Sequence, residues 1–163
     1  MTFGPKSWSV GEVVTAAMLN EQIRDQFNSM FGAWTPYTPT WTAASNPSIG
    51  NGTLTGQYIK IGRTCHVVLK LTTGSTTTYG SGGYSFGVPF TSAAGIDYTG
   101  SARLVAVQAW HGGTIMSGGS SAFNATFPTS ATDSRSASMA ATVPDTLAAG
   151  HVLRASITYQ TAT

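Results

Sequence analysis

The sequence predicts a mainly β fold, in which an N-terminal extended arm and a short helix precede an antiparallel β-sandwich of jelly-roll type. Three observations predict it. Short runs of alternating apolar and polar residues follow one another at near-regular spacing after about residue 40. Glycine pairs at 82–83, 112–113 and 118–119 separate these runs as hairpin turns do. A helical pattern occurs near the N-terminus, before the first of them.

Composition narrows the class of protein. The 163 residues suit a single domain, and the 41% hydrophobic content excludes the composition of a disordered chain. Charged residues make up 9%, against about 25% in an average soluble domain. The net charge of +2 gives no field for steering onto nucleic acid, so we expect no nucleic-acid partner. The single cysteine, Cys65, lies in an alternating apolar run and is expected to be a buried thiol.

The sequence also predicts neither a membrane-spanning helix nor a secretory signal peptide. No apolar stretch approaches the ~20 residues that a bilayer-crossing helix needs, so we expect no membrane insertion. The first residues carry Gly, Pro, Ser and Glu where a secretory signal has an apolar core. We therefore expect the chain to be made and folded in a cytoplasm, without export by a signal peptide.

The helix is predicted over about residues 16–31. Thr15 is placed to cap its first turn, and Gly32 follows its last residue. Apolar residues recur along it at spacings of four, four and three, on one face: Leu19, Ile23, Phe27 and Met30. Either this face lies on the β domain, or identical helices of neighbouring chains pack around an axis. The nearly 3.5-residue period favours the second arrangement, in which these four residues form the oligomerisation seam.

A domain boundary follows the helix, in the segment WTPYTPTW at residues 34–41. Pro36 and Pro39 impose extended geometry on the residues before them and exclude helix. Five of the chain's charged residues also lie within its first 31 residues. The sequence therefore divides into an N-terminal segment of residues 1–36 and a β domain of residues 37–163.

The best-specified element of the β domain is a hairpin. One arm is predicted at Tyr58–Ile61 and the other at Thr64–Thr72, with Gly62 supplying the positive φ of the turn. Tyr58 and Lys60 share a face, so the lysine stem is expected to pack along the ring. We interpret the hairpin as a structural element that sets the register of the sheet; a direct role in binding is the alternative.

The hairpin resembles a module of bacteriophage virion proteins in which G-x-Y-x-K-I-G precedes one strand and a later strand ends in L-P-F. The residues that match the first element are Gly56, Tyr58, Lys60, Ile61 and Gly62. Those that match the second are Val88, Pro89 and Phe90, with Val where Leu is usual, and Pro39 to Trp41 fits an upstream Trp-Thr-Pro element. Residues 8–28 are similar to the start of small tail-associated proteins of phages of actinobacteria. The two resemblances together cover about residues 8–90.

This resemblance implies a structural protein of the virion that is not an enzyme and carries no cofactor. The family implies a homotrimer that is assembled in the bacterial host cytoplasm. Residues 1–36 would attach it to other virion proteins, and residues 37–163 would face outward, where they meet a host surface glycan or protein. We expect a tail-tip or tail-fibre component. The alternative is a head decoration protein anchored to the capsid surface by its N-terminal segment.

Catalytic patterns are weak. Residues 83–87 match G-x-S-x-G, but Ser85 lies within a predicted strand and not at a strand-to-helix turn. The three histidines share no metal-ligand spacing: His66, His111 and His151. The β domain has three acidic residues from which a glycosidase would draw its two carboxyls: Asp97, Asp133 and Asp145. We expect no catalytic and no metal site, and a glycan or cell-wall hydrolase is a remote alternative.

Surface recognition is the remaining possibility for the β domain. Tyr79, Trp110 and His111 lie beside glycine-rich stretches, where aromatic rings stack on sugars or anchor protein contacts. For Trp110 the alternative is a place in the core, on the face that it shares with Leu104. We take Tyr79, Trp110 and His111 as the candidate recognition residues.

Overall fold

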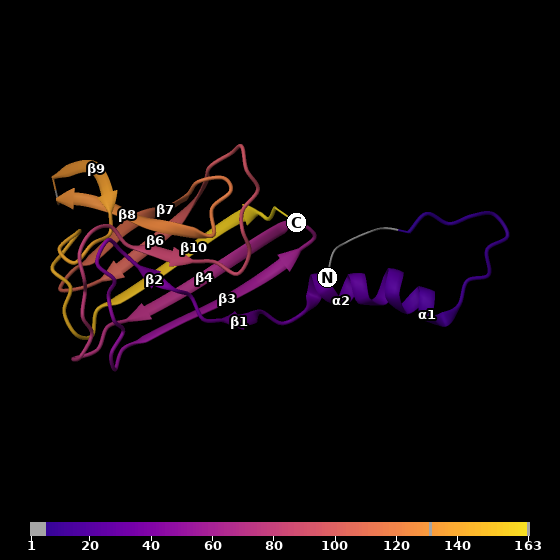
Figure 1. Cartoon of the computed structure of the whole chain (residues 1–163), viewed down its shortest axis with the longest axis horizontal. Coiled ribbons are helices and arrows are strands. Elements are labelled where there is room, and N and C mark those ends of the chain that lie inside the picture. The colour runs from indigo at the N-terminus through magenta and orange to yellow at the C-terminus, as the bar shows by residue number, and fades with distance from the viewer. Residues whose placement is uncertain (1–5, 131, 163) are drawn as a thin grey trace.

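The computed structural model describes residues 6–130 and 132–162. A β domain stands at one side and the N-terminal helix projects from it at the other (Figure 1). The elements have these bounds: α1 Ala16–Leu19, η1 Asn20–Arg24, α2 Asp25–Phe31, β1 Thr35–Tyr37, β2 Trp41–Thr42, β3 Thr53–Ile61, β4 Thr64–Thr72, β5 Ser85–Gly87, β6 Tyr98–Val105, β7 Ala109–Met116, β8 Ala122–Ser130, β9 Asp133–Ser138 and β10 Val152–Gln160. The prediction of a mainly β, antiparallel fold after one N-terminal helix is confirmed.

The helix runs from Ala16 to Phe31, as predicted, but it is not α-helical throughout. Residues 20–24 form a π turn, in which the N–H of Asp25 donates to the carbonyl of Asn20. Gly32 follows the last helical residue with φ −64° and ψ 157°. It therefore ends the helix in an extended conformation, and the left-handed cap that glycine often provides is not used here.

The strands form one antiparallel path in the order β1-β3-β4-β10-β6-β7-β8-β5-β2, with β9 paired to β8. The end strands β1 and β2 are separated in the chain by residues 38–40 alone, a connection of at most about 14 Å. The path must therefore curl until its two ends approach. Two hydrogen bonds cross this closure: Tyr37 Oη donates to the Gly87 carbonyl at 3.3 Å, and the Gly87 N–H donates to the Thr40 carbonyl at 3.0 Å. A jelly-roll sandwich is not confirmed by this strand order.

The core lies inside the curl and is built by alternation along the long strands. On β4 the predicted inward residues are buried, and on β10 the same holds, as predicted: Cys65, Val67, Leu69, Leu71, Leu153, Ala155, Ile157 and Tyr159. Aromatic side chains from β5 and β8 meet them: Phe86, Phe123 and Phe127. The Cys65 thiol is completely buried, and burial raises its pKa. The opposite face of β4 and β10 is directed outward.

The hairpin β3–β4 confirms the prediction from sequence, with a first arm that begins five residues earlier, at Thr53. Gly62 adopts φ +57° in the turn, where a side chain would be strained. Both arms have nine residues and remain in register from Thr53↔Thr72 to Ile61↔Thr64. This hairpin therefore supplies two of the long strands on which the core is built.

Three predictions in the β domain are wrong. The run at residues 101–110 is not one strand, because the chain turns at residues 106–108 between β6 and β7. The glycine pair 112–113 is not a turn but lies inside β7. There a side chain on Gly112 would collide with the Thr126 carbonyl and the Phe127 ring of β8, so glycine allows the close approach of the two strands. The expected strand at residues 84–90 is limited to β5, and Val88 to Phe90 lie outside it.

Candidate functional site

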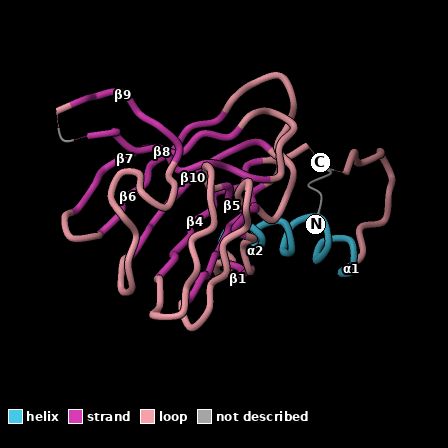
Figure 2. Tube along the Cα trace, turned by 60° about the vertical axis from the view of Figure 1, so that its left-hand side comes forward, coloured by secondary structure: helices cyan, strands magenta, loops and turns pink. Residues whose placement is uncertain are grey.

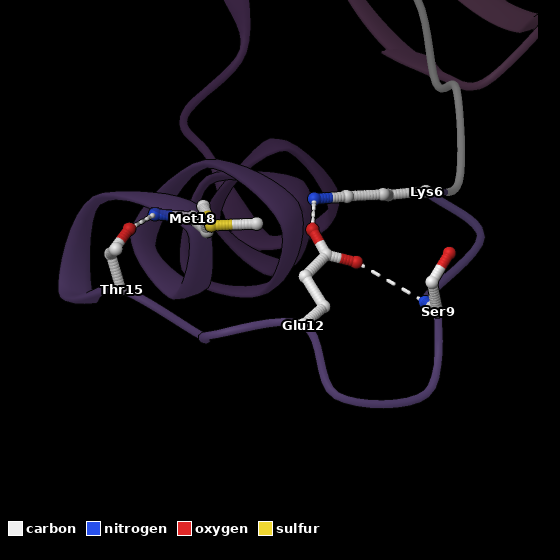
Figure 3. Close-up of polar contacts among 5 residues, drawn as sticks. All are labelled: Lys6, Ser9, Glu12, Thr15 and Met18. Atoms are coloured by element: carbon white, nitrogen blue, oxygen red, sulfur yellow. Dashed lines mark hydrogen bonds and ion pairs between the residues drawn. The ribbon is translucent and has the colours of Figure 1, made fainter.

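Polar contacts order the arm that precedes the helix (Figure 3). The Lys6 ammonium donates to Glu12 Oε1, and the Ser9 N–H donates to Glu12 Oε2 at 3.2 Å. The bond from Lys6, followed by that from Ser9, lowers the pKa of the Glu12 carboxyl. Thr15 Oγ1 accepts from the Met18 N–H at 3.2 Å, which confirms the predicted N-cap. Contacts between residues that are close in sequence thus fix the conformation of the arm and of the first helical turn.

Among residues 6–130 and 132–162, nothing covers the apolar face of this helix. Its four predicted seam residues are exposed, at 44–56% of their full surface: Leu19, Ile23, Phe27 and Met30. Large apolar residues before and after them are exposed as well: Trp8, Val10, Val13, Val14 and Phe31. Figure 2 shows the helix (cyan) at one end of the β domain, where α2 lies beside the strands and contacts β3 while α1 lies farther from them. The arrangement in which it covers the sheet of its own chain is therefore absent from this structure.

The two elements of the virion-protein motif contact each other. The Tyr58 ring meets the Phe90 ring edge to face, with centroids 5.2 Å apart. The Lys60 ammonium lies over the Phe90 ring, 4.6 Å from its centroid. The Lys60 ammonium thus lies against Phe90, and the contact of the lysine stem with the Tyr58 ring stays a prediction. Gly56 has no space for a side chain, because the Tyr37 ring lies against it. Gly56, Tyr58 and Lys60 thus have packing roles.

The catalytic motif on residues 83–87 has no catalytic geometry. Ser85 begins strand β5, and no helix follows this strand. The Ser85 hydroxyl accepts a hydrogen bond from Asn124 Nδ2 at 2.9 Å. The nucleophile elbow requires a serine at a turn from strand to helix, so this serine is a structural residue of the sheet.

The three histidines have separate partners. The imidazole of His66 lies 2.6 Å from Thr158 Oγ1 and meets the Trp34 ring edge to face, while His151 Nδ1 accepts from the Ala148 N–H at 3.2 Å. His111 is exposed on β7. Among residues 6–130 and 132–162, no group of three or more His, Cys, Asp or Glu side chains is placed to hold a metal ion.

The acidic residues of the β domain are likewise engaged in turns. Asp97 Oδ1 accepts from the Gly118 N–H at 3.2 Å, and Asp145 Oδ1 accepts from the Thr146 N–H at 2.8 Å. The Asp133 side chain lies outside the described residues. The structure thus gives no pair of facing carboxyls for glycoside hydrolysis among the residues that it describes.

The candidate recognition residues do not share one surface. Tyr79 packs against the core, and its carbonyl accepts a hydrogen bond from the Tyr84 hydroxyl at 2.7 Å. Trp110 also packs against the core, half-buried. His111, the next residue on β7, is directed to the opposite, outer face. Of the three, His111 alone lies on the outer face of β7.

The structure reveals a surface that sequence reasoning missed, on the outer face of the sheet. Arg154 of β10 is paired with Lys70 of β4 on one side and with Arg103 of β6 on the other. Arg103 is paired in turn with His111 of β7. All four side chains are exposed, and they line a groove of about 1140 Å³. We call Lys70, Arg154, Arg103 and His111 the basic row.

The basic row has no charge compensation. Neither Asp nor Glu is found among the residues that line the groove. None of the four side chains has an ion-pair partner in the described part of the chain. Small polar residues flank the row along the same strands, and Ser101 Oγ and Ser156 Oγ lie 3.0 Å apart. Since like charges directly opposite each other destabilise a sheet, this arrangement carries a cost in stability.

Two members of the row, Lys70 and Arg154, carried a local signal in the sequence. Lys70 stands between the buried residues Leu69 and Leu71, and Arg154 between the buried Leu153 and Ala155, so alternation predicts that both point outward. Alternation does not predict which strands pair, and this pairing is what places residues 70, 103, 111 and 154 side by side. That pairing follows from the insertion of β10 between β4 and β6.

The N-terminal helix and the basic row are thus the two surfaces without a partner in the chain. In the described residues, no helix combines the length and the apolar character that a membrane crossing requires. Comparisons with protein-family models, with curated proteins and with solved structures gave no match. A functional conclusion therefore depends on the geometry of these two surfaces and on the motifs of the sequence.

Proposed function

We propose that this chain is a structural protein of a bacteriophage virion, a homotrimeric component of the tail tip or tail fibre. In this proposal residues 1–36 attach it to other virion proteins, and the β domain, of jelly-roll type, faces outward. The observation that carries the proposal is the exposed apolar face of the projecting helix. The resemblance of the hairpin and of residues 8–28 to phage virion proteins, described above, supports the same proposal.

The helix favours copies of this chain as its partners. Its 16 residues are about 24 Å long, and an isolated helix of this length is marginal in water. Identical helices offer one another identical apolar faces, with Leu19, Ile23, Phe27 and Met30 at the spacing that short bundles use. Exposed apolar surface on this scale marks an interaction site, and three helices around one axis remove it from water.

The decisive experiment is the mass of the full chain in solution, measured by light scattering. We expect about three times 16.9 kDa. The double substitution of Ile23→Asp and Phe27→Asp should give a monomer, because it places charge in the seam. Asn28→Asp adds charge at an exposed residue outside the seam and should leave the trimer intact.

The outcomes separate the competing roles. A monomeric parent chain contradicts the trimer. A trimer that survives both seam substitutions moves the interface to the β domain and leaves the helix for attachment alone. A tail component and a head decoration protein differ in copy number per virion, which quantitative mass spectrometry of purified particles measures. A copy number in the hundreds would replace the tail role by the capsid role.

A further inference from the structure

We propose that the basic row binds a linear acidic oligosaccharide, a glycan that carries one anionic group on each sugar. The site goes beyond the proposed function, since it lies entirely in the β domain and is complete within one chain. It would operate in a monomer or a trimer, inside or outside a virion.

The spacing of the row suits a repeating anion. Its four residues lie on the adjacent strands β4, β10, β6 and β7, which run side by side in that order (Figure 1). Neighbouring strands are about 4.8 Å apart, so the four positions advance in equal steps across about 14 Å. One step is close to the length of one sugar in an extended chain. A glycan lying across the strands would therefore place its anionic groups within reach of the basic side chains.

The side chains suit carboxylate or phosphate groups. Arg154 and Arg103 occupy the centre of the row, and guanidinium groups bind both anions through paired hydrogen bonds. Lys70 and His111 stand at its two ends. Because the row has no acidic neighbour among the residues lining the groove, its charge is available to a ligand.

The polar part of the remaining lining suits sugar hydroxyls. Four small polar or amide side chains lie on the outer face beside the row: Thr55, Gln57, Ser101 and Ser156. Their hydroxyl and amide groups both donate and accept hydrogen bonds, as sugar hydroxyls do. They flank the basic row along the strands, so a chain lying across the strands meets cations and hydroxyls together.

The same lining disfavours a single-stranded nucleic acid. Such ligands are bound by aromatic side chains on which bases stack, in addition to basic groups. The one Tyr, Phe or Trp residue that lines the groove is Tyr37. Its ring packs against Gly56 and Tyr58, and its hydroxyl donates to Gly87, so the ring is not presented for stacking.

The test is isothermal titration calorimetry of the full chain with a purified linear tetramer of galacturonic acid. We expect saturable binding of one tetramer per chain, weakened by salt, and no binding of the neutral tetramer cellotetraose. Arg154→Gln and Arg103→Gln should each weaken binding by about tenfold or more, as expected for loss of a charge-assisted contact. Arg154→Lys keeps the charge but loses the paired bonds, and should retain binding of intermediate strength.

The matched control is Arg24→Gln, which removes the same charge from the N-terminal helix and should leave binding unchanged. Linear tetraphosphate is a second probe: if it binds more tightly and is equally sensitive to Arg154→Gln, the site stands and its anion is phosphate.

Three results would overturn the proposal: no binding of either polyanion, an equal loss in Arg24→Gln, or preferential binding of oligothymidylate. Calorimetry measures ligand binding in the groove, and light scattering measures the oligomeric state that the helix is proposed to determine. Failure of this proposal is therefore distinguishable from failure of the proposed trimer.

Discussion

The helix and the basic row are both surfaces without a partner in the chain, but they differ in chemistry. The helix offers apolar side chains, whose burial is non-directional and is not screened by salt. The basic row offers the like charges of Lys70, Arg154 and Arg103 in register, which act over about 10 Å and are screened by salt. The first suits permanent association, and the second suits reversible recognition. In the two proposals, assembly and recognition thus fall to separate parts of this molecule, one before the β domain and one on its sheet.

The largest predicted effect is the difference in stability loss between a buried leucine and an exposed one. Leu153→Ala empties a site that is 1% exposed on β10 and should lower the free energy of unfolding by about 2–5 kcal/mol. Leu19→Ala makes the same chemical change at a residue that is 44% exposed in the chain. It should leave the urea midpoint of the β domain unchanged and weaken the trimer. Urea unfolding followed by near-ultraviolet circular dichroism measures the first effect, and light scattering on dilution measures the second.

Equal losses of β-domain stability in the two leucine variants would break the comparison. Such a result would mean that the helix packs on the sheet of its own chain in solution, and the seam would then be part of the core.

A smaller effect, of opposite sign, is expected in the basic row. Arg154→Gln removes a charge that lies directly opposite both Lys70 and Arg103. It should raise the free energy of unfolding by about 0.2–1 kcal/mol, while it weakens the binding of acidic glycan. Differential scanning calorimetry at low salt measures the gain, which should shrink as salt is added.

Arg24→Gln is again the control, and it should give no gain because Arg24 is paired with Asp25. A loss of stability in Arg154→Gln would show that Arg154 stabilises the sheet, and the contrast between a binding surface and the structural core would fail.

The smallest effect concerns the arm before the helix. Because hydrogen bonds from Lys6 and Ser9 lower the pKa of Glu12, its ionised form stabilises the arm above the ordinary glutamate pKa. That contribution is lost as the pH falls through the lowered pKa. The Glu12 carboxyl should titrate below its usual range, and Lys6→Gln should raise its midpoint. Nuclear magnetic resonance of the Glu12 side-chain carboxyl measures both midpoints, and an identical midpoint in the variant would contradict the role of Lys6.

Local patterns made one part of this structure predictable. The helix bounds, the cap at Thr15 and the turn at Gly62 follow from residues within a few positions of each other. The inward residues of β4 and β10 follow from alternation in the same way. The four residues of the predicted seam are exposed in the chain, and their role in oligomerisation stays a prediction.

The basic row was not predictable, because it depends on pairing between distant residues. Nothing near Arg103 indicates that Arg154 will lie opposite it, since 50 residues and three strands separate them in the chain. The glycine pair 112–113 was misread for a related reason. A glycine that opens a turn and a glycine that admits a neighbouring strand are alike in sequence, and the contact with Phe127 of β8 distinguishes them.

The closure of the curled sheet has a mechanical consequence. A pull on the N-terminal helix enters the β domain through residues 35–42, which pair with β3 at one end of the sheet and with β5 at the other. The load is therefore divided between two edges that are distant along the strand order. Peeling β1 from β3 does not free the chain, because the next residues are held by β5 through the Thr40 and Trp41 backbone. Residues 35–42 thus distribute tension from the helix to both ends of the sheet.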